Sequence, residues 1–408
     1  MAIMLHDTLL AQAREIADRI TDLRRAIHAE PELGLHTPRT RDKIRAALAH
    51  LPLEWREGPS TTGLVATLIG DGGQGRSVLL RGDMDALPMP EETGLDFAST
   101  IPGVMHACGH DAHVAMLAGA AELLCARKGS LKGEVRFMFQ PGEEGHHGAR
   151  FMLDDGLLGG EGHDRPLPDA AFALHVMPNA PHGLVGGRAG PLLAAADQIE
   201  IVVTGRGGHA SMPHQTLDPV PIACEIVAAI QTMVARRFSV FDPVVVTIAR
   251  IEGGTAHNVI ADTARMTGTM RTLSAANRAR LKGELPALAA GIAGAHGLSA
   301  ETTILEGFPV TICDPRAVDF GETVARDLFG AQGFLRLADP IMGAEDFAYV
   351  LEKVPGAMFF LGVSHEGEDW QHCCGIHSTR MMVDESVMPQ GAAYLAGLAE
   401  SYLARGFS

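Results

Sequence analysis

The sequence predicts an α/β protein of two domains, in which a smaller α+β domain interrupts a larger α/β one. Three observations predict this class. The chain has 408 residues, which is too long for one ordinary core. Strand-like and helix-like segments alternate in its first part and again in its last part. Residues 192–306 follow a different order of elements, which indicates a separate inserted unit.

The larger domain is assigned to residues 1–191 and 307–408. Apolar residues recur every three or four positions from Leu9 to Ile27, which predicts an amphipathic helix that Pro31 ends. Helices are also predicted over about 111–127 and near 386–404. Short apolar runs with turn signals around them predict strands at 61–70, 77–83, 134–140 and 169–176. This alternation predicts an α/β sandwich with a largely parallel sheet.

The inserted domain, residues 192–306, reads as strand, helix, strand, strand, helix, strand. The first strand is "DQIEIVVTG", the first helix is "DPVPIACEIVAAIQTMVARR", and the last strand is "SAETTILEG". The order β-α-β-β-α-β is that of a split βαβ, ferredoxin-like domain.

Composition limits the partners and the cellular location. The chain has 33 basic and 49 acidic residues, a formal charge of −16, so we expect it to bind neither nucleic acid nor an anionic membrane. It shows no targeting segment and no stretch long and apolar enough to span a bilayer. Six cysteines in so long a chain do not form a disulfide scaffold, and the adjacent Cys373 and Cys374 are interpreted as structural or incidental. A cytoplasmic protein is expected.

The stretch "MHACGHDAH" at residues 105–113 carries three histidines, a cysteine and an aspartate ahead of a predicted helix. Cys108 and His110 flank one glycine, so both can point into the same cleft. Thiolate and imidazole are good ligands for borderline divalent metals. The alternative is a surface histidine cluster beside a buried cysteine, and the stretch alone leaves both open.

A second stretch, "FMFQPGEEGHHGAR", places Glu143 and Glu144 in a turn after an apolar strand. Ligands in α/β folds bind at the carboxyl ends of the strands, where such a turn lies. Adjacent acids are often merely solvated, and a lone histidine at a strand end is often a core residue. Joint occurrence favours one shared cleft, with further pieces at Asp83, Asp85, His175 and His377.

Such a set of side chains suits hydrolysis at a two-metal site. That chemistry needs metal ligands, a general base that is not itself a ligand, and a group that stabilises the oxyanion. In the smaller domain, His209, His257, Asn258 and Arg271 lie in or after predicted turns. A histidine, an amide and a guanidinium suit a substrate carboxylate and a developing oxyanion. Ordinary turn chemistry is the alternative.

These motifs resemble the amidohydrolase branch of the co-catalytic metallopeptidases. That branch groups hippurate hydrolases, N-acyl-amino-acid amidohydrolases and plant auxin-conjugate hydrolases, and it is related to aminoacylases and carboxypeptidase G. The resemblance runs through nearly the whole chain and is carried by "RGDMDALP", "MHACGHDAH", "FQPGEEGHHGAR", "ALHVMP", "GRGGHAS", "GGTAHNVIAD", "GAEDFAYV" and "HS".

The resemblance implies a zinc-peptidase-like, three-layer α/β/α catalytic domain with an inserted lid domain that also dimerises. It implies a general base at Glu143 and two divalent metal ions per subunit, whether manganese, zinc, cobalt or nickel. His209, Asn258 and Arg271 match lid residues that bind the substrate carboxylate and polarise the scissile carbonyl. The lid histidine is expected to reach the partner subunit of a homodimer, which could pair further into a tetramer. The implied metal ligands are Cys108, His110, Glu144, His175 and His377.

The chain departs from more distant relatives, which carry a histidine ligand where Asp83 stands and a bridging aspartate where Cys108 stands. Asp83 and Asp85 are therefore expected to orient ligands, and Asp111 is expected to orient a neighbour. "GAEDFAYV" places Glu345 and Asp346 either beside the site or at an ordinary helix start.

The expected function is metal-dependent hydrolysis of the amide bond of N-acyl amino acids, hippurate-like or N-acetylated, to a carboxylic acid and an amino acid. Alternatives within the enzyme class are a dipeptidase and an N-acetyl-diaminopimelate deacetylase. Two others are a metal-binding or regulatory protein on the same scaffold, and a redox or metal-storage role for Cys108.

Overall fold

The computed structural model describes residues 2–372 and 374–408, so Cys373 lies outside the described residues. The chain forms two compact units. Unit 1 comprises Met1–Leu192, Ile312–Asp339 and Asp346–Ser408, and unit 2 comprises Leu193–Thr311 and Pro340–Glu345. Unit 2 therefore runs five residues beyond the expected boundary at 306 and also takes in a short segment from much later in the chain.

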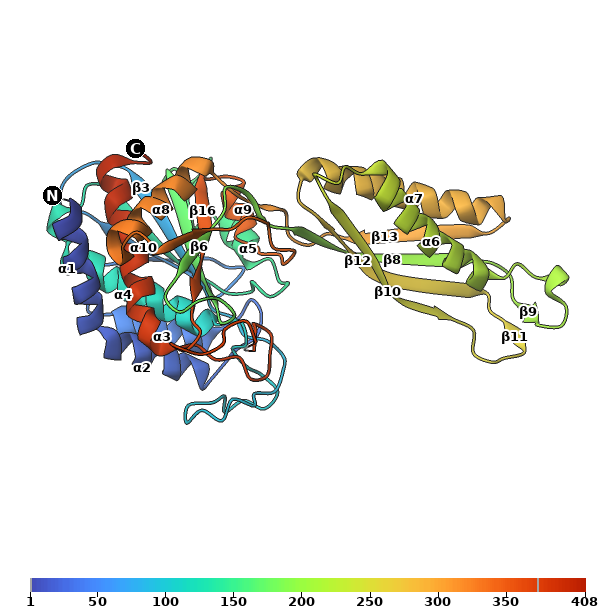
Figure 1. The fold of residues 1–408 in the computed structure, drawn as a ribbon, viewed down its shortest axis with the longest axis horizontal. Helices are drawn as coiled ribbons and strands as arrows, with labels where there is room; N and C mark the ends of the chain where they lie inside the picture. The colour runs from blue at the N-terminus through green and yellow to red at the C-terminus, as the bar shows by residue number, and fades with distance from the viewer. Residues whose placement is uncertain (1, 373) are drawn as a thin grey trace. The chain divides into compact units, whose positions relative to one another are not determined.

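Unit 1 is built on an eight-stranded mixed sheet (Figure 1). Its middle strands β4, β3, β5 and β16 run parallel, whereas β1, β2 and β4 pair antiparallel, as do β16 and β6. β3 and β16 are buried along their whole length, and β16 is a continuous apolar run, whereas β3 also buries Arg81 and Asp83. In sheet order the strands are β1 (Glu54–Glu57), β2 (Leu64–Ile69), β4 (Glu134–Gln140), β3 (Ser77–Asp83), β5 (Ala170–Met177), β16 (Gly356–Gly362), β6 (Val185–Gly187) and β15 (Phe334–Arg336).

Helices cover this sheet, with α4 and α10 on one side and α5 and α9 on the other (Figure 1). α4 and α10 pack on each other and on β3, and both are apolar nearly all round because they are buried. The helices of unit 1 are α1 (Ala2–Glu15), α2 (Ala17–His28), α3 (Pro38–Leu48), α4 (His110–Ala126), α5 (Gly148–Asp154), α8 (Pro315–Phe329), α9 (Ala348–Leu351) and α10 (Met388–Arg405).

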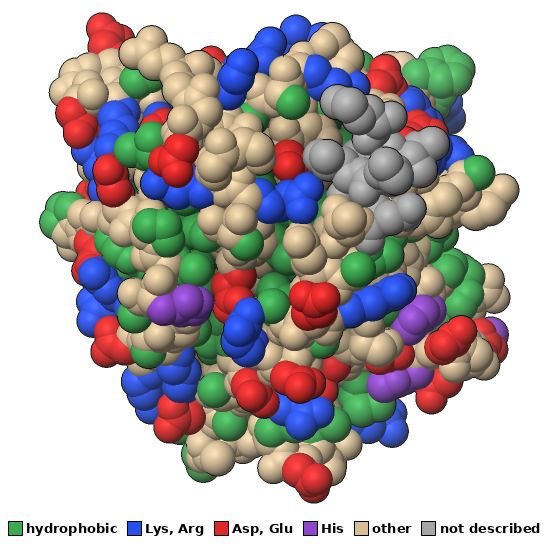
Figure 2. All heavy atoms as spheres, turned by 90° about the vertical axis from the view of Figure 1, so that its left-hand side faces the viewer, with side chains coloured by type: hydrophobic (Ala, Val, Ile, Leu, Met, Phe, Trp, Pro, Cys, Tyr) green, Lys and Arg blue, Asp and Glu red, His purple; other side chains and the backbone are tan. Residues whose placement is uncertain are grey.

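The single amino-terminal helix predicted from the periodicity is wrong, because the chain breaks it at Ile16 into α1 and α2. The two pieces differ in their main neighbours. α1 packs mainly against α10 and α8, whereas α2 packs mainly against α4 and α3. On the face of unit 1 that includes α1, acidic and basic side chains are interspersed (Figure 2).

Unit 2 has a four-stranded antiparallel sheet in the order β10-β12-β8-β13, with α6 and α7 side by side against it (Figure 1). The chain order of these elements is that of a ferredoxin-like fold, and the predicted class, α/β with an inserted α+β unit, is confirmed. The elements are β8 (Ala195–Thr204), α6 (Pro219–Arg237), β10 (Val244–Gly253), β12 (Thr263–Thr272), α7 (Ala275–Ala295) and β13 (Ser299–Leu305).

Two smaller pairings complete the described strands. In unit 2, β9 (Gly208–His209) pairs antiparallel with β11 (Val259–Ile260) beyond one end of the four-stranded sheet. β7 (Gly190–Leu193) and β14 (Thr311–Cys313) form a separate two-stranded sheet.

α6 corrects one expectation, since it is long and apolar enough, by length and composition alone, to cross a membrane. Its apolar face is used within unit 2, where Ile222, Ile226, Ile230 and Met233 are buried in the same core cluster as the sheet residues Ile199 and Met266. The Asp218 carboxylate accepts from the Val220 N–H and caps the helix.

Candidate metal centre

The turn that carries Cys108 and His110 depends on the glycine between them. Gly109 has φ +85°, a left-handed conformation that other residues adopt at a cost, and it precedes the first residue of α4. A Cβ atom there would lie 2.3 Å from Val176 Cγ2 on the neighbouring strand. Glycine thus lets the turn approach β5 closely, next to His175.

Five side chains from distant parts of the sequence converge near the carboxyl ends of β3, β4 and β5. The predicted ligands form overlapping groups whose potential ligand atoms lie within 4.8 Å of one another. Cys108 groups with His110 and His175. It also groups with Glu144 and His377, and His110 groups with Glu143 and Glu144. The structure therefore brings all five predicted ligands, and the predicted base, into one cluster.

Backbone carbonyl groups fix how two of the histidines point. The Nδ1 of His110 donates to the Asp85 carbonyl oxygen at 2.8 Å, and the Nδ1 of His175 donates to the Val176 carbonyl oxygen at 2.7 Å. Both Nε2 atoms are thereby directed to the cluster, and His175 Nε2 lies 3.4 Å from Cys108 Sγ. A second hydrogen bond that sets the ring orientation is typical of metal-binding histidine.

Asp85 holds the Glu143-Glu144 turn in place. Its Oδ1 accepts from the Glu143 N–H at 2.9 Å, and its Oδ2 accepts from the Glu144 N–H at 3.0 Å. The carbonyl oxygen of Asp85 also accepts from His110 Nδ1. This one buried residue therefore orients two predicted ligands, His110 and Glu144, and the predicted base Glu143. Gly142, at φ +73°, lets the chain turn just before these acids.

Asp83 and His113 form a hydrogen-bonded pair beside the cluster, and both ring nitrogens of His113 have partners within the chain. The Nδ1 of His113 donates to Asp83 Oδ1 at 2.6 Å, and its Nε2 accepts from the Val176 N–H at 2.8 Å. With both ring nitrogens engaged, His113 has no lone pair left for a metal. It instead ties the end of β3 to the strand residue that follows His175.

Three buried side chains, Arg81, Gln140 and Asp346, form a further network in this region. Only Asp346 among them is a candidate site residue from the sequence. Arg81 donates to Asp83 Oδ2 at 2.6 Å, to Gln140 Oε1 at 2.9 Å and to Asp346 Oδ1 at 3.1 Å. Asp346 also accepts from Gln140 Nε2 and from the Ala149 N–H at the start of α5. A single sequence carries no signal for such contacts, because Arg81 and Asp346 are 265 positions apart.

Without a bound metal, the predicted ligands His110, His377 and Cys108 all have raised pKa values. Burial opposes a charge on His110, but the nearby Asp83 carboxylate, Cys108 and a hydrogen bond to Asp85 together outweigh it and hold the pKa of His110 well above its ordinary value. Hydrogen bonds to Cys108 and Glu144 raise the pKa of His377 to about 10. Burial raises the pKa of the Cys108 thiol, so bound metal rather than the protein would keep it a thiolate.

The residues present fit a pair of divalent ions. The donor set combines sulfur, nitrogen and oxygen, which suits borderline first-row metals. Within the described part of the chain, His110 Nε2 is buried and makes no hydrogen bond, which is costly for a polar atom unless something coordinates it. His377 adds strain, since its φ is +63°. Such strain in a residue other than glycine is common at functional sites.

The predicted substrate residues of unit 2 lie at two ends of its sheet. His209 is exposed on β9, its Nδ1 accepts from Ser211, and Ala210 donates its N–H to the Asn258 carbonyl oxygen. Arg271 pairs with Ala196 at the other end of β12 and donates to the Met342 carbonyl oxygen at 2.6 Å. The structure thus brings His209 and Asn258 together, and it does not bring Arg271 to them.

A family model settles the relationship that the motifs suggested. The model of peptidase family M20/M25/M40 matches residues 79–401, most of the chain. The chain belongs to this family. The resemblance predicted from the motifs is therefore confirmed.

Relatives of this M20-family chain cover nearly its whole length. Thermostable carboxypeptidase 1 of Saccharolobus solfataricus is 38% identical, over 99% of each chain. N-acetylcysteine deacetylase of Bacillus subtilis is 37% identical, over 93% of this chain and 96% of the relative. The crystal structure of Bacillus subtilis YxeP, titled a dinuclear metal-binding peptidase of the M20 family, is 34% identical with a TM-score of 0.82, covering 96% of this chain and 99% of that one.

The family and the geometry agree on the class of chemistry. The chain is a metal-dependent amide hydrolase, and its site suits two divalent metal ions. The non-enzymatic alternatives, a regulatory scaffold or a metal store, find no support in these relatives.

Proposed function

We propose that the chain hydrolyses the amide bond of N-acyl amino acids and releases a carboxylic acid and a free amino acid. The observation that carries this is the convergence of Cys108, His110, Glu144, His175 and His377 in one cluster beside Glu143. The names of the relatives support the substrate class. A carboxypeptidase and an N-acetylcysteine deacetylase both act on an acylated amino group next to a free carboxylate.

In the proposed mechanism Cys108, His110, Glu144, His175 and His377 hold the metals. The bound ions would lower the pKa of water and polarise the scissile carbonyl. Glu143, whose Oε2 lies 4.0 Å from His110 Nε2, accepts the proton of the attacking water and passes it to the leaving amine. Asp85 keeps Glu143 and Glu144 in register, so that one acid coordinates and the other remains free to move a proton.

Unit 2 supplies substrate binding in this proposal. Because Nδ1 of His209 accepts from the Ser211 N–H, its Nε2 bears the proton and can donate to a developing oxyanion. Asn258 adds an amide beside it, and Arg271 suits the substrate carboxylate. Arg271 lies eight residues along β12 from Thr263, at the opposite end of the sheet. Eight residues of an antiparallel strand span roughly 27 Å.

That separation supports a homodimer. His209 and Asn258 lie too far from Arg271 to bind one small substrate within a single copy of unit 2. We propose that His209 and Asn258 complete the site of a partner subunit, so that residues 192–306 act as a lid and dimerisation domain and residues 1–191 with 307–408 as the catalytic domain. A tetramer would pair two such dimers. The physiological metal is manganese, zinc, cobalt or nickel, and the location is the cytoplasm.

A second candidate is cleavage of dipeptides or of the last residue of longer peptides. The 38% identity to a carboxypeptidase over 99% of both chains favours it specifically. The same groups would serve, since a peptide is an acylated amino acid at its carboxyl end, and only the pocket for the acyl side would differ.

A hydrolysis panel with defined metals tests the proposal. Benzoyl-glycine, N-acetyl amino acids, dipeptides and N-acetyl-diaminopimelate are offered to enzyme loaded with Mn²⁺, Zn²⁺, Co²⁺ or Ni²⁺. We expect the highest kcat/KM on simple N-acyl amino acids and loss of activity when their carboxylate is amidated. A preference for dipeptides would favour the second candidate, and equal turnover of the amidated compounds would contradict the role of the carboxylate.

A further inference from the structure

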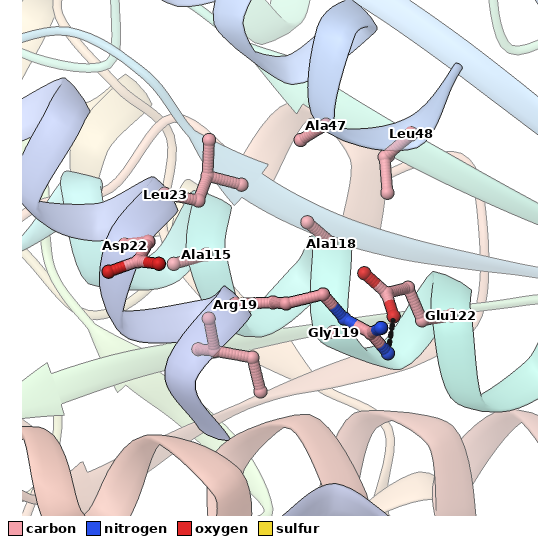
Figure 3. A pocket seen from close by; sticks show the side chains of 10 residues that line it. Arg19, Asp22, Leu23, Ala47, Leu48, Ala115, Ala118, Gly119 and Glu122 are labelled. Atoms are coloured by element: carbon pink, nitrogen blue, oxygen red, sulfur yellow. Dashed lines mark ion pairs between the residues drawn. The ribbon is translucent and has the colours of Figure 1, made fainter. Parts of the chain in front are cut away.

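The contact between α2 and α4 in unit 1 has two unlike halves. Toward the far end of α4 it is hollow, with a cavity of about 320 Å³ lined by small and apolar side chains from α2, α3 and α4 and by the charged Arg19, Asp22 and Glu122 (Figure 3). Arg19 and Glu122 form an ion pair at 2.5 Å in this lining, and the Arg19 side chain is 62% exposed. Toward the start of α4, the same two helices are joined by fully buried charges.

Those buried charges converge on Asp111, the second residue of α4. Arg24 Nε donates to Asp111 Oδ2 at 2.9 Å, and His28 Nδ1 donates to the same oxygen at 2.8 Å. The other nitrogen of His28 lies 3.1 Å from Glu91 Oε1, so both ring nitrogens face carboxylates. Arg24 also reaches Glu385 Oε1 at 3.0 Å. Burying so many charges contributes little to stability, but it restricts geometry.

One arm of this network reaches the turn that holds two predicted ligands. Asp111 directly follows His110 and lies three positions after Cys108. Its carboxylate is fixed from α2, a helix 83 to 87 positions earlier in the chain. Arg24 and His28 therefore set where the first turn of α4 begins, and with it the position of Cys108 and His110.

The other arm leads toward His377. Glu91 lies in the long segment between β3 and α4, and its second oxygen accepts from the Ser99 N–H at 2.7 Å. The next residue, Glu92, donates its N–H to the Thr379 carbonyl oxygen at 2.7 Å and accepts from Thr379 Oγ1 at 2.7 Å. Thr379 stands two positions after His377, so this arm fixes the segment that carries that ligand.

We propose that Arg24 and His28 are positioning residues of the metal centre, which pre-organise Cys108 and His110 through Asp111 and His377 through Glu91 and Glu92. Neither side chain touches a predicted ligand. Their effect is on affinity for metal, because a site held in the binding geometry spends less free energy on ordering when an ion arrives. The proposal rests on the ligand assignment of the proposed function.

The test compares two arginines that bridge the same pair of helices. Metal-free Arg24→Gln and Arg19→Gln are titrated with Co²⁺ against a competing chelator, and the cobalt–thiolate absorption reports coordination by Cys108. We expect Arg24→Gln to weaken Co²⁺ binding by about tenfold or more, the loss typical of residues that orient ligands. Arg19→Gln removes the same charge from the exposed half and should bind Co²⁺ as the parent does.

Two further variants keep the test decisive if Arg24→Gln does not fold. Arg24→Lys keeps the charge but cannot serve Asp111 and Glu385 together, and His28→Gln keeps a donor toward Asp111 only. Both should bind Co²⁺ more weakly than Arg19→Gln. Parental affinity in both, with only thermal stability lowered, would overturn the proposal. Cys108→Ser tests the ligand assignment separately from the positioning role of Arg24 and His28. A cobalt–thiolate band that survives in this variant would refute the ligand assignment.

Discussion

The candidate metal centre of unit 1 and the proposed substrate residues of unit 2 are built in opposite ways. In the metal centre Cys108 and His110 are buried, and the rings and carboxylates are held by backbone groups, by Asp85 and by Asp83. In unit 2, His209 is exposed on a two-residue strand, and Arg271 lies at the far end of β12. The first group is complete within one chain, whereas the second is divided, as expected for residues that serve two subunits.

The largest effect tests the metal centre itself. Glu143→Gln removes the proposed base but keeps the size of the side chain, and kcat/KM should fall by about 10²–10⁴-fold, the usual contribution of a general base. Metal content, measured by elemental analysis, should stay at two ions per chain. Retained activity would refute the role of Glu143, and lost metal would make it a ligand instead.

The next largest effect is expected from His209, an exposed residue of unit 2. His209→Ala should lower kcat by about 10²–10³-fold, as for the loss of one oxyanion donor, with little change in KM or in metal content. His214→Ala, at a nearby exposed histidine of unit 2, serves as the control and should keep full activity. Equal activity of the two variants would remove His209 from the mechanism.

A smaller effect is expected for the carboxylate anchor. Arg271→Met should raise KM roughly tenfold or more for N-acyl amino acids, since a charge-assisted hydrogen bond to a carboxylate is lost. It should not lower further the small residual kcat/KM for the amidated analogues, which lack that carboxylate. Arg265 lies on the same strand with an exposed side chain paired to Glu200, so Arg265→Met is a matched control. A rise in KM in both variants would indicate general damage to β12.

The smallest effect is a pH dependence of metal binding. In the metal-free chain, hydrogen bonds to Cys108 and then to Glu144 raise the pKa of His377 from 6.5 to about 10. A proton must leave this ring when an ion binds, so His377 should make affinity rise with pH up to about 10, in addition to the protons that His110 and Cys108 give up. Because the pKa of His377 is higher in the folded metal-free chain than in the unfolded chain, its protonation adds to the free energy of unfolding. This contribution is fully present below pH 6.5 and is lost as pH rises through about 10.

Calorimetric titration across that pH range measures this dependence. His377→Asn should reduce the slope by about one released proton, whereas His372→Asn, at an exposed position of the same segment, should preserve it. An unchanged slope in His377→Asn would place the released proton elsewhere in the cluster.

Local patterns predicted most of the fold. The strands at 77–83 and 134–140 match β3 and β4 to the residue, because each has a short apolar run, 78–80 and 137–139, with polar residues at its ends. The break at Ile16 was missed, because the apolar period continues through it while the partner surfaces change. Inclusion of 340–345 in unit 2 likewise depends on contacts that no local window contains.

Residue types and strand ends predicted which side chains would gather, and the family resemblance assigned their roles. What the sequence could not predict is how they are held. The contacts of Arg81 with Asp346 and of Arg24 with Asp111 join positions 265 and 87 apart. Such partners become visible only when the sheet and helices are assembled.

Complementation between two inactive variants tests the central claim most directly, namely that a buried metal centre in one chain is completed by the exposed residues of another. Glu143→Gln and His209→Ala subunits are mixed after reversible dissociation. If His209 acts across the dimer, half of the dimers are mixed and each has one intact site, so about one quarter of the parental activity should return. If no activity returns although mixed dimers are shown to form, His209 acts within its own chain and the account is contradicted.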